Sequence, residues 1–350
     1  MVVVLGVDVH KRMHTFVAVD EVGKQLGQVT VGADGKGHLK VLRWARLEFP
    51  GERIWGIEDC RHLSARLERD LLTGGEQVVR VPPKLMAQTR ASARTRGKSD
   101  PIDALAVARA VLREPDLPVA AHDLVSRELK LLVDRREDLV AERTRMINRF
   151  RWHLHELDPH LDPSPRSLDR AKTLAGLAEQ LARFDGLVAE LARDILADID
   201  RISQAITVLD RRIRDRVKEQ AVGLIGLPGC AALTAAKILG ETAGVSRFRS
   251  EACYAQHAGV APIPVWSGNT AGRVRMSRAG NRQLNAALHR IAVTQIRLDG
   301  EGRRYYRKRL LAGDSSTEAL RRLKRRLARI VFKTLHSLDQ PTTGSQPAAA

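Results

Sequence analysis

The order of apolar segments in the first third of the chain is the feature that most constrains its fold. Five runs have the β-branched or alternating pattern of strands: residues 2–9, 14–19, 28–31, 53–57 and 77–81. The first three follow one another directly, whereas segments of helical spacing at residues 38–47 and 62–72 separate the later ones. Three strands followed by strands that alternate with helices predict a mixed α/β sheet with helices on its faces.

The strand pattern disappears after Pro118, and two long helices are predicted in its place. Apolar residues recur every seven positions between Leu132 and Leu154, and in steps of three and four between Val188 and Val217. Such spacing is typical of coiled-coil helices, which either fold back on each other or pair with another subunit. We therefore expect an all-α part after the α/β domain. The predicted divisions are an α/β domain at residues 1–118, a coiled-coil helical domain at 119–220, a mainly helical C-terminal domain at 221–338 and a disordered tail at 339–350.

The chain carries a strong excess of positive charge, with a formal net charge of +18. This excess favours a polyanionic partner, of which nucleic acid is the most common. A membrane is the alternative, but no run approaches the ~18 consecutive apolar residues that a spanning helix needs, and residues 1–7 lack the basic start of a secretion signal. Only 4% of the residues are aromatic, which argues against a platform that stacks single-stranded bases. The three cysteines, Cys60, Cys230 and Cys253, suggest neither disulfides nor a zinc site, so we expect a cytoplasmic protein.

Acidic residues follow two of the predicted strands, and two more open a helix. Asp8 ends the first strand and Glu58 the fourth, with Asp59 as the alternative for the second position. Asp100 precedes a proline that suits the first turn of a helix, so Asp100 is the expected N-cap and Asp103 lies one turn further on the same face. Four carboxylates that converge at a sheet edge and a helix start are expected to bind two Mg²⁺ ions. Capping of the helix and turns after the strands are the alternative explanations of these acids.

A proline-flanked loop in the last third of the chain holds Ser267 directly before a glycine. A serine hydroxyl that attacks phosphorus needs positive charge around the phosphate. Three arginines follow the serine: Arg273, Arg275 and Arg278. Ser277 is the competing nucleophile, although its expected role is to cap the next helix. The plainer alternatives are a turn serine and a solvated, phosphate-binding face.

Residues 227–237 form a third candidate, with a glycine-containing turn that leads into a helix. The pattern is typical of a helix-hairpin-helix, in which amides at the helix start hold a phosphate without reading bases. A bare turn between helices is the alternative. We expect five residues of the C-terminal part to bind nucleic acid: Lys237, Arg273, Arg275, Arg278 and Asn281.

The acidic motifs resemble those of a known family. The order Gly-Val-Asp-Val-His-Lys, then Ile-Glu, then Lys-Ser-Asp-Pro-Ile-Asp-Ala resembles the RuvC-like DEDD domain of the Piv-type insertion-sequence transposases. The resemblance implies an RNase H-like fold and a catalytic Mg²⁺ site formed by Asp8, Glu58, Asp100 and Asp103. The chain departs from the family at residues 59–62, Asp-Cys-Arg-His, where many members have an aromatic motif.

The C-terminal motifs are similar to those of the same transposases. The pair Ser-Gly is followed by Ser-Arg-Ala-Gly-Asn at residues 277–281, as in the family's serine domain. The similarity implies that Ser267 is the nucleophile and forms a covalent serine–DNA intermediate together with the acidic site. It also implies a structured guide RNA, encoded by the element, that recognises donor and target DNA. A dimer or tetramer would assemble through the long helices.

Three other functions are alternatives to this interpretation. A Holliday-junction endonuclease would use the same four acids with water as the nucleophile. An actin-like ATPase or sugar kinase would need a glycine-rich phosphate turn beside the strands, and none follows Asp8. A non-catalytic DNA- or RNA-binding protein would bind nucleic acid without cutting it.

Overall fold

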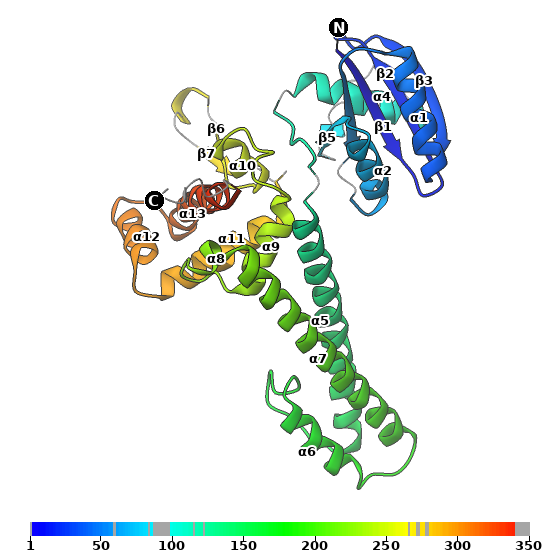
Figure 1. Ribbon diagram of the computed structural model, residues 1–350. Helices are drawn as coiled ribbons and strands as arrows, with labels where there is room; N and C mark the ends of the chain where they lie inside the picture. The colour runs from blue at the N-terminus through cyan, green and yellow to red at the C-terminus, as the bar shows by residue number, and fades with distance from the viewer. Residues whose placement is uncertain are drawn as a thin grey trace, which may run out of the picture. The chain divides into compact units, whose positions relative to one another are not determined.

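The computed structural model (Figure 1) describes residues 2–58, 61–82, 85–86, 99–114, 116–121, 123–264, 267–270, 274–276 and 280–339. The chain divides into two compact units. One comprises Met1–Asp123, Ala243–Ala292 and Asp299–Ala350, and the other comprises Leu124–Thr242 and Val293–Leu298. No helix in the described ranges combines the length and the apolar character needed to span a membrane. The predicted tail lies outside these ranges, apart from Asp339.

A five-stranded mixed sheet begins the first unit. Its strands are β1 (Val3–Val9), β2 (Met13–Val19), β3 (Gln25–Gly32), β4 (Arg53–Glu58) and β5 (Gln77–Val81). The strand order is β3-β2-β1-β4-β5, with β2 antiparallel to both neighbours and β1, β4 and β5 parallel. This arrangement confirms the predicted mixed sheet and is the topology of the RNase H-like fold.

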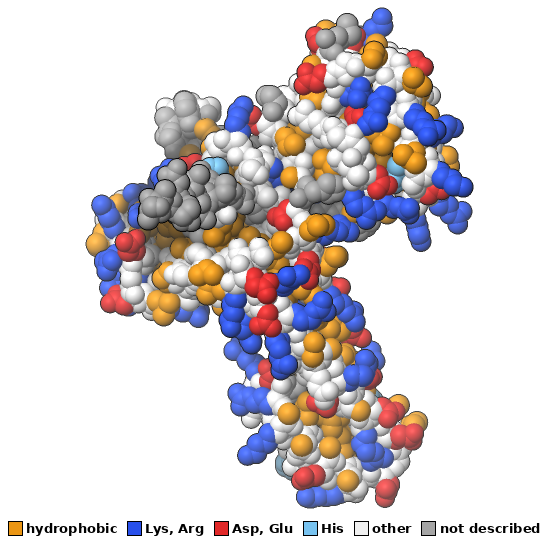
Figure 2. Space-filling model, viewed as in Figure 1, with side chains coloured by type: hydrophobic (Ala, Val, Ile, Leu, Met, Phe, Trp, Pro, Cys, Tyr) orange, Lys and Arg blue, Asp and Glu red, His pale blue; other side chains and the backbone are white. Residues whose placement is uncertain are grey.

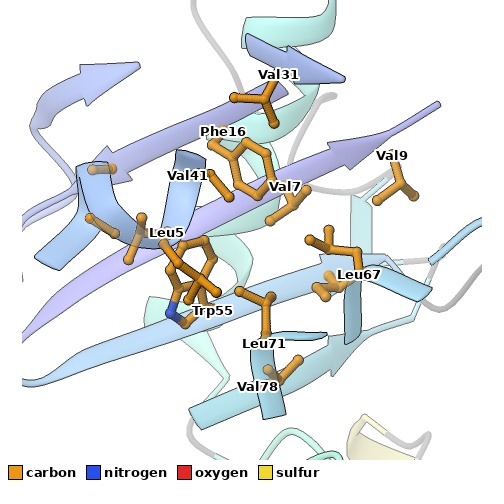
Figure 3. Close-up of a cluster of buried hydrophobic side chains, with 14 of the residues drawn as sticks. Leu5, Val7, Val9, Phe16, Val31, Val41, Trp55, Leu67, Leu71 and Val78 are labelled. Atoms are coloured by element: carbon orange, nitrogen blue, oxygen red, sulfur yellow. The ribbon is translucent and has the colours of Figure 1, made fainter. Parts of the chain in front are cut away.

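Both faces of the sheet are covered by helices, and the alternation of side chains along β1 separates the two cores. Odd-numbered residues from Val3 to Val9 pack with α1 (Gly35–Glu48) and α2 (Arg61–Thr73) in the cluster of Figure 3. Phe16 and Trp55 meet edge to face in this cluster, with ring centroids 5.8 Å apart. Val4, on the other face, packs with α4 (Asp100–Arg113). Burial on both faces explains why β1 is an almost continuous apolar run.

Helix α4 approaches β1 closely because residue 6 has no side chain. A Cβ placed on Gly6 would lie 2.1 Å from the carbonyl oxygen of Ala104 and 2.4 Å from the backbone nitrogen of Ala108. Gly56 of β4 is a second such point, because a Cβ there would lie 2.5 Å from Cγ2 of Val111. These two glycines therefore determine how closely α4 packs on the sheet.

The second unit is built on two long helices that pack against each other (Figure 1). They are α5 (Leu124–Leu157) and α7 (Leu187–Gln220), with α6 (Ala171–Leu181) packed on α7. Phe150, Leu177 and Ile199 meet in one buried cluster of this unit. Arg136 of α5 donates a hydrogen bond from Nε to Oδ1 of Asp210 of α7 over 2.5 Å. The long helices thus fold back on each other within one chain.

Two shorter helices of the second unit follow, α8 (Val222–Ile225) and α9 (Ala232–Thr242). Gly229, in the turn between them, has a φ of 85°, which favours glycine. Lys130 of α5 donates from Nζ to Oε1 of Glu241 over 2.6 Å, and Lys237 pairs with Glu137 of α5. Residues 222–242 therefore pack with the long helices, whereas the predicted C-terminal domain begins at residue 221.

The remaining elements are short helices and one pair of short strands. They are α10 (Glu251–His257), β6 (Pro262–Pro264), the 3-10 helix η1 (Gly268–Thr270), β7 (Val274–Met276), α11 (Arg282–Arg297), α12 (Glu301–Leu311) and α13 (Ser316–Asp339). The sequence predicts only a loop around Ser267, but β6 and β7 pair antiparallel on either side of it.

We predict that Gly6→Ala destabilises the sheet domain by about 3 kcal/mol, the upper end of the usual cost of overpacking, because the new methyl group would overlap the backbone of α4. Gly176→Ala is the matched control, since Gly176 lies inside α6 with no atom within 4 Å of a new Cβ. This second change should stabilise α6 by roughly 0.5–1 kcal/mol. Thermal unfolding of both variants tests the difference. A Gly6→Ala protein as stable as the wild type would contradict this packing.

Two buried histidines, one in β2 and one in α1, stack on each other. The rings of His14 and His38 lie 5.4 Å apart at 16°, and His38 forms a 2.6 Å hydrogen bond from Nδ1 to Oδ2 of Asp70. Burial, with the nearby His38, lowers the pKa of His14 to about 4. The unfolded chain therefore takes up a proton at His14 as the pH falls below about 6.5, while the folded chain does not.

We predict that the sheet domain loses about 1–2 kcal/mol of stability between pH 7 and pH 5 through His14 alone. His14→Leu should reduce this loss, because leucine cannot take up the proton in the unfolded chain. Native-state amide exchange of β2 at the two pH values, corrected for intrinsic rates, measures the effect. His160→Leu, at an exposed histidine, is the control and should keep the full loss. An equal loss in His14→Leu would show that another group causes it.

Candidate active site

The first two predicted acids lie at one edge of the sheet and on one face. Asp8 is the penultimate residue of β1, on the side of Val4 and Gly6 that faces α4, and its side chain is only 12% exposed. Val7 pairs with Ile57 in the parallel ladder of β1 and β4, so Glu58 follows at the same edge. Glu58 lies two residues after Gly56 in β4 and is therefore on the same face of the sheet, the one that α4 covers. This position favours Glu58 over Asp59 as the second acid. Asp59 lies outside the described residues.

The other two acids come from the first turn of α4. Asp100 was the expected N-cap, but the structure assigns that position to Ser99, which has extended backbone angles and makes no side-chain cap bond. Asp100 is the first helical residue, and the Asp103 N–H donates to the Ser99 carbonyl over 3.0 Å. The helix therefore begins one residue earlier than predicted. At this position the negative charge of Asp100 interacts favourably with the positive end of the helix dipole, and no capping hydrogen bond is needed for this. Asp103 is 8% exposed, whereas Asp100 is open to solvent.

Three of these side chains form a compact group. Nε2 of His10 lies 2.9 Å from Oδ2 of Asp8 and 3.4 Å from Oδ1 of Asp100. Ligand atoms of all three residues lie within 4.8 Å of one another, whereas Glu58 and Asp103 are not part of this group in the described chain. His10 is not among the site residues predicted from the sequence. Its position two residues after Asp8, at the start of the β1–β2 turn, was the available signal.

The ionised form of Asp8 is disfavoured in this group, as its pKa shows. Burial raises the pKa of Asp8 above its ordinary value, and the negative charges of Asp103 and Asp100 raise it further. The charge and hydrogen bond of His10 act in the opposite direction but do not cancel the rise. A cation among these groups would reverse the effect, because it favours the ionised carboxylate.

The donor set fits a divalent metal ion. Carboxylate oxygens are the ligands that Mg²⁺ and Mn²⁺ accept, and an imidazole nitrogen is more usual for transition metals. Asp8 and Asp100 are already close enough to share one ion, and Asp103 is close enough to Asp8 to influence its pKa.

The predicted residues of the C-terminal part lie in several places. Ser267 is exposed between β6 and η1, and Asn281 caps α11 by accepting the Leu284 N–H at Oδ1 over 2.9 Å. Lys237 is paired with Glu137, so its charge is already compensated. Arg275 is placed in β7 by its backbone alone. Ser277, Arg273 and Arg278 lie outside the described residues.

Comparison with known proteins finds two transposase domain families in this chain. A domain family described as Transposase, DEDD_Tnp_IS110, matches residues 5–159, and the Transposase IS116/IS110/IS902 family matches residues 223–307. The chain belongs to this family of insertion-sequence transposases. The two matches include all four predicted acids and Ser267, and they occur in the order that the family resemblance implied.

Individual relatives span nearly the whole transposase. The chain is 27% identical to the uncharacterized 42 kDa protein of insertion element IS900 of Mycobacterium paratuberculosis, over 98% of both chains. It is 28% identical to the uncharacterized 44.8 kDa protein of IS116 of Streptomyces clavuligerus, over 95% of this chain and 94% of the relative. A solved structure, T. thermophilus RuvC in complex with a Holliday junction substrate, covers 33% of this chain and 98% of its own, at 16% identity and a TM-score of 0.26.

Family membership fixes the general activity of this transposase. Transposases of this family act in DNA recombination, and their DEDD domain implies the use of a divalent metal ion. The group at Asp8 is the part of the described chain that suits such an ion.

We predict that Asp8→Asn weakens Mn²⁺ binding about tenfold or more, because a neutral amide replaces a carboxylate at the metal. Asp138→Asn is the matched control, at an exposed acid of α5, and should bind Mn²⁺ as the wild type does. Electron paramagnetic resonance of the bound ion measures both affinities. Wild-type affinity should fall as the pH is lowered through the raised pKa of Asp8, since protons then compete with the metal. Equal affinity in the two variants would place the metal elsewhere.

Proposed function

We propose that this transposase cuts and rejoins DNA through the hydroxyl of Ser267, with Mg²⁺ held by Asp8, Glu58, Asp100 and Asp103. The observation that carries the proposal is the convergence of Asp8 and Asp100 at the edge where β1 ends and α4 begins. Asp103 shares the first turn of α4 with Asp100 and influences Asp8, and Glu58 belongs to the strand that pairs with β1. Mg²⁺ in such a site would stabilise the negative charge that develops on the phosphate oxygens.

The surroundings of Ser267 support its role as the attacking group. Its side chain is exposed, and the following Gly268 has a φ of 49°, which gives the backbone a sharp bend at the serine. Arg273, Arg275 and Arg278 follow within the same segment and would bind the phosphate that Ser267 attacks. As the serine oxygen bonds to phosphorus, its proton would pass to an ionised carboxylate of the acidic group. The bond from phosphorus to a sugar oxygen of the DNA would break, and that oxygen would leave as a hydroxyl after taking up a proton; attack by a strand-end hydroxyl on the serine–phosphate bond would rejoin the DNA and release the serine.

Two surface features support the proposed partners: positive charge for nucleic acid, and exposed apolar residues for a second copy of the chain. Lys and Arg side chains are spread over the visible face of the protein (Figure 2), and the net charge is +18. We propose that donor and target DNA, together with an element-encoded guide RNA, bind through this excess, with Arg273, Arg275, Arg278 and Asn281 among the contacts. Lys237 would join them only if its ion pair with Glu137 opens. Large apolar side chains on α5 and α7 remain exposed after the two helices pair, including Leu131, Trp152 and Val208. We propose that they form the contacts of a homo-oligomer.

We predict that Ser267→Ala abolishes the covalent protein–DNA adduct and strand exchange, because alanine has no hydroxyl to attack phosphorus. Nucleic-acid binding should stay within about threefold of wild type, since binding rests on phosphate contacts. Labelled DNA carrying the two ends of the element, incubated with Mg²⁺ and analysed under denaturing conditions, measures the adduct. Ser164→Ala, at an exposed serine between α5 and α6, is the matched control.

The result separates this mechanism from hydrolysis. Strand exchange by Ser267→Ala at the wild-type rate would remove Ser267 as the nucleophile. Continued cleavage without an adduct would instead indicate that the acidic group activates water, as in an endonuclease.

A further inference from the structure

The residues on either side of the segment that carries Ser267 are in close backbone contact. Its two ends meet at Gly259 and Gly280, where a Cβ on Gly280 would lie 2.2 Å from the backbone nitrogen and Cα of Gly259. The N–H of Asn281 donates to the carbonyl of His257 over 2.6 Å across the same point. The entering and leaving chains are therefore in direct backbone contact at the base of residues 260–280, which we call the serine segment.

One side chain bonds to this base from α11. Nδ2 of Asn285 donates to the carbonyl of Ala258 over 2.9 Å and to that of Gly259 over 3.1 Å. Both carbonyls belong to the last residues before the serine segment. Asn285 thus uses both of its amide hydrogens to fix the direction in which the segment leaves the fold.

A buried lysine of α13 completes the arrangement. Lys324 is 7% exposed, and its Nζ donates to Oδ1 of Asn285 over 2.5 Å. In the part of the chain that the structure describes, Asn285 is its hydrogen-bond partner and no carboxylate pairs with it. Burial, together with the charge of Arg321, lowers the pKa of Lys324. A buried amine without a counter-ion is costly, so packing alone does not explain a lysine here.

Lysine has a chemical property that suits this position. An ammonium group only donates hydrogen bonds, so the atom of Asn285 that faces it must be the oxygen. The Asn285 amide is then held in the one orientation that points Nδ2 at the two carbonyls. A positive charge on the oxygen side also polarises the amide and strengthens its N–H donors.

We propose that Lys324 and Asn285 are positioning residues that hold the base of the serine segment and thereby place Ser267 for attack on DNA. The proposal rests on the proposed role of Ser267. Lys324 reaches the serine only through Asn285 and the carbonyls of residues 258 and 259, so its loss should affect the rate of reaction more than DNA binding.

Two substitutions of similar length separate hydrogen bonding from packing. Lys324→Met fills the same space without a donor, whereas Lys324→Gln keeps an N–H that can reach Oδ1 of Asn285. We predict that Lys324→Met speeds amide exchange in peptides covering residues 257–261 and 280–284 by about tenfold and slows adduct formation about 10- to 100-fold, because small misplacement of a reacting group is costly. The KM for DNA carrying the element's ends should change less than about threefold.

The thermal midpoint distinguishes positioning from stability. Lys324→Met should unfold at the wild-type temperature or above it, because a buried charge has been removed. Lys324→Gln should restore exchange and rate to within about threefold of wild type. Asn285→Asp is a second variant, which still accepts a bond from Lys324 but has lost both donors to the carbonyls, and it should behave as Lys324→Met does.

Three results would overturn the proposal. Unchanged amide exchange in Lys324→Met and Asn285→Asp would show that the pair does not hold the base. Faster exchange with an unchanged rate would show that the base does not place the serine. A rate that follows the thermal midpoint in every variant would show a purely structural role. Failure of the proposed nucleophile would be seen separately, as a wild-type rate in Ser267→Ala, and it would leave the exchange results intact.

Discussion

The contact between the backbone of β1 at Gly6 and the backbone of α4 at Ala104 and Ala108 is the constraint on which the acidic site depends. With no side chain between them, the helix lies against the strand at a distance that even one methyl group would prevent. The strand carries Asp8 two residues after Gly6, and the helix carries Asp100 and Asp103 in its first turn. The close approach of two backbones therefore brings together carboxylates that are more than ninety residues apart in the sequence.

That convergence is electrostatically unfavourable in the protein by itself. Asp8 is largely buried and lies near two other acids, so its carboxylate is harder to ionise than usual. His10 offsets part of the penalty through its contacts with Asp8 and Asp100. Groups held in an unfavourable arrangement by the rest of a fold are typical of functional sites, because a ligand or substrate relieves the penalty. Here a divalent cation has the charge and the ligand preference to do so.

The C-terminal part of the chain repeats the same physical principle. Gly259 and Gly280 allow two backbones to touch, and the contact fixes where the segment bearing Ser267 begins and ends. Around it, polar atoms that are normally solvated are buried and used: the Asn285 amide bonds to two carbonyls, and Lys324 bonds to the amide. In both parts of this transposase, glycines allow two backbones to touch, and a largely buried ionisable side chain lies nearby: Asp8 in the sheet domain and Lys324 in the C-terminal part. Ser267 and Asp100 are both exposed to solvent.

The sequence by itself determined the mixed sheet and the two long helices, because these depend on local periodicity. It also predicted that Asp8 and Asp100 come together, through the rule that sites form at the ends of parallel strands. It misplaced the helix cap by one residue and did not count His10, since a cap and a side-chain contact depend on backbone angles and rotamers. Only the tertiary structure decided that the long helices pair within one chain. It also decided that Lys324 is buried and bonded to Asn285. In the sequence, Lys324 is one of many basic residues of a helix and is indistinguishable from a solvent-exposed lysine. Its burial arises only when α13 meets α11, because burial depends on the packing of the whole chain and not on the residue itself.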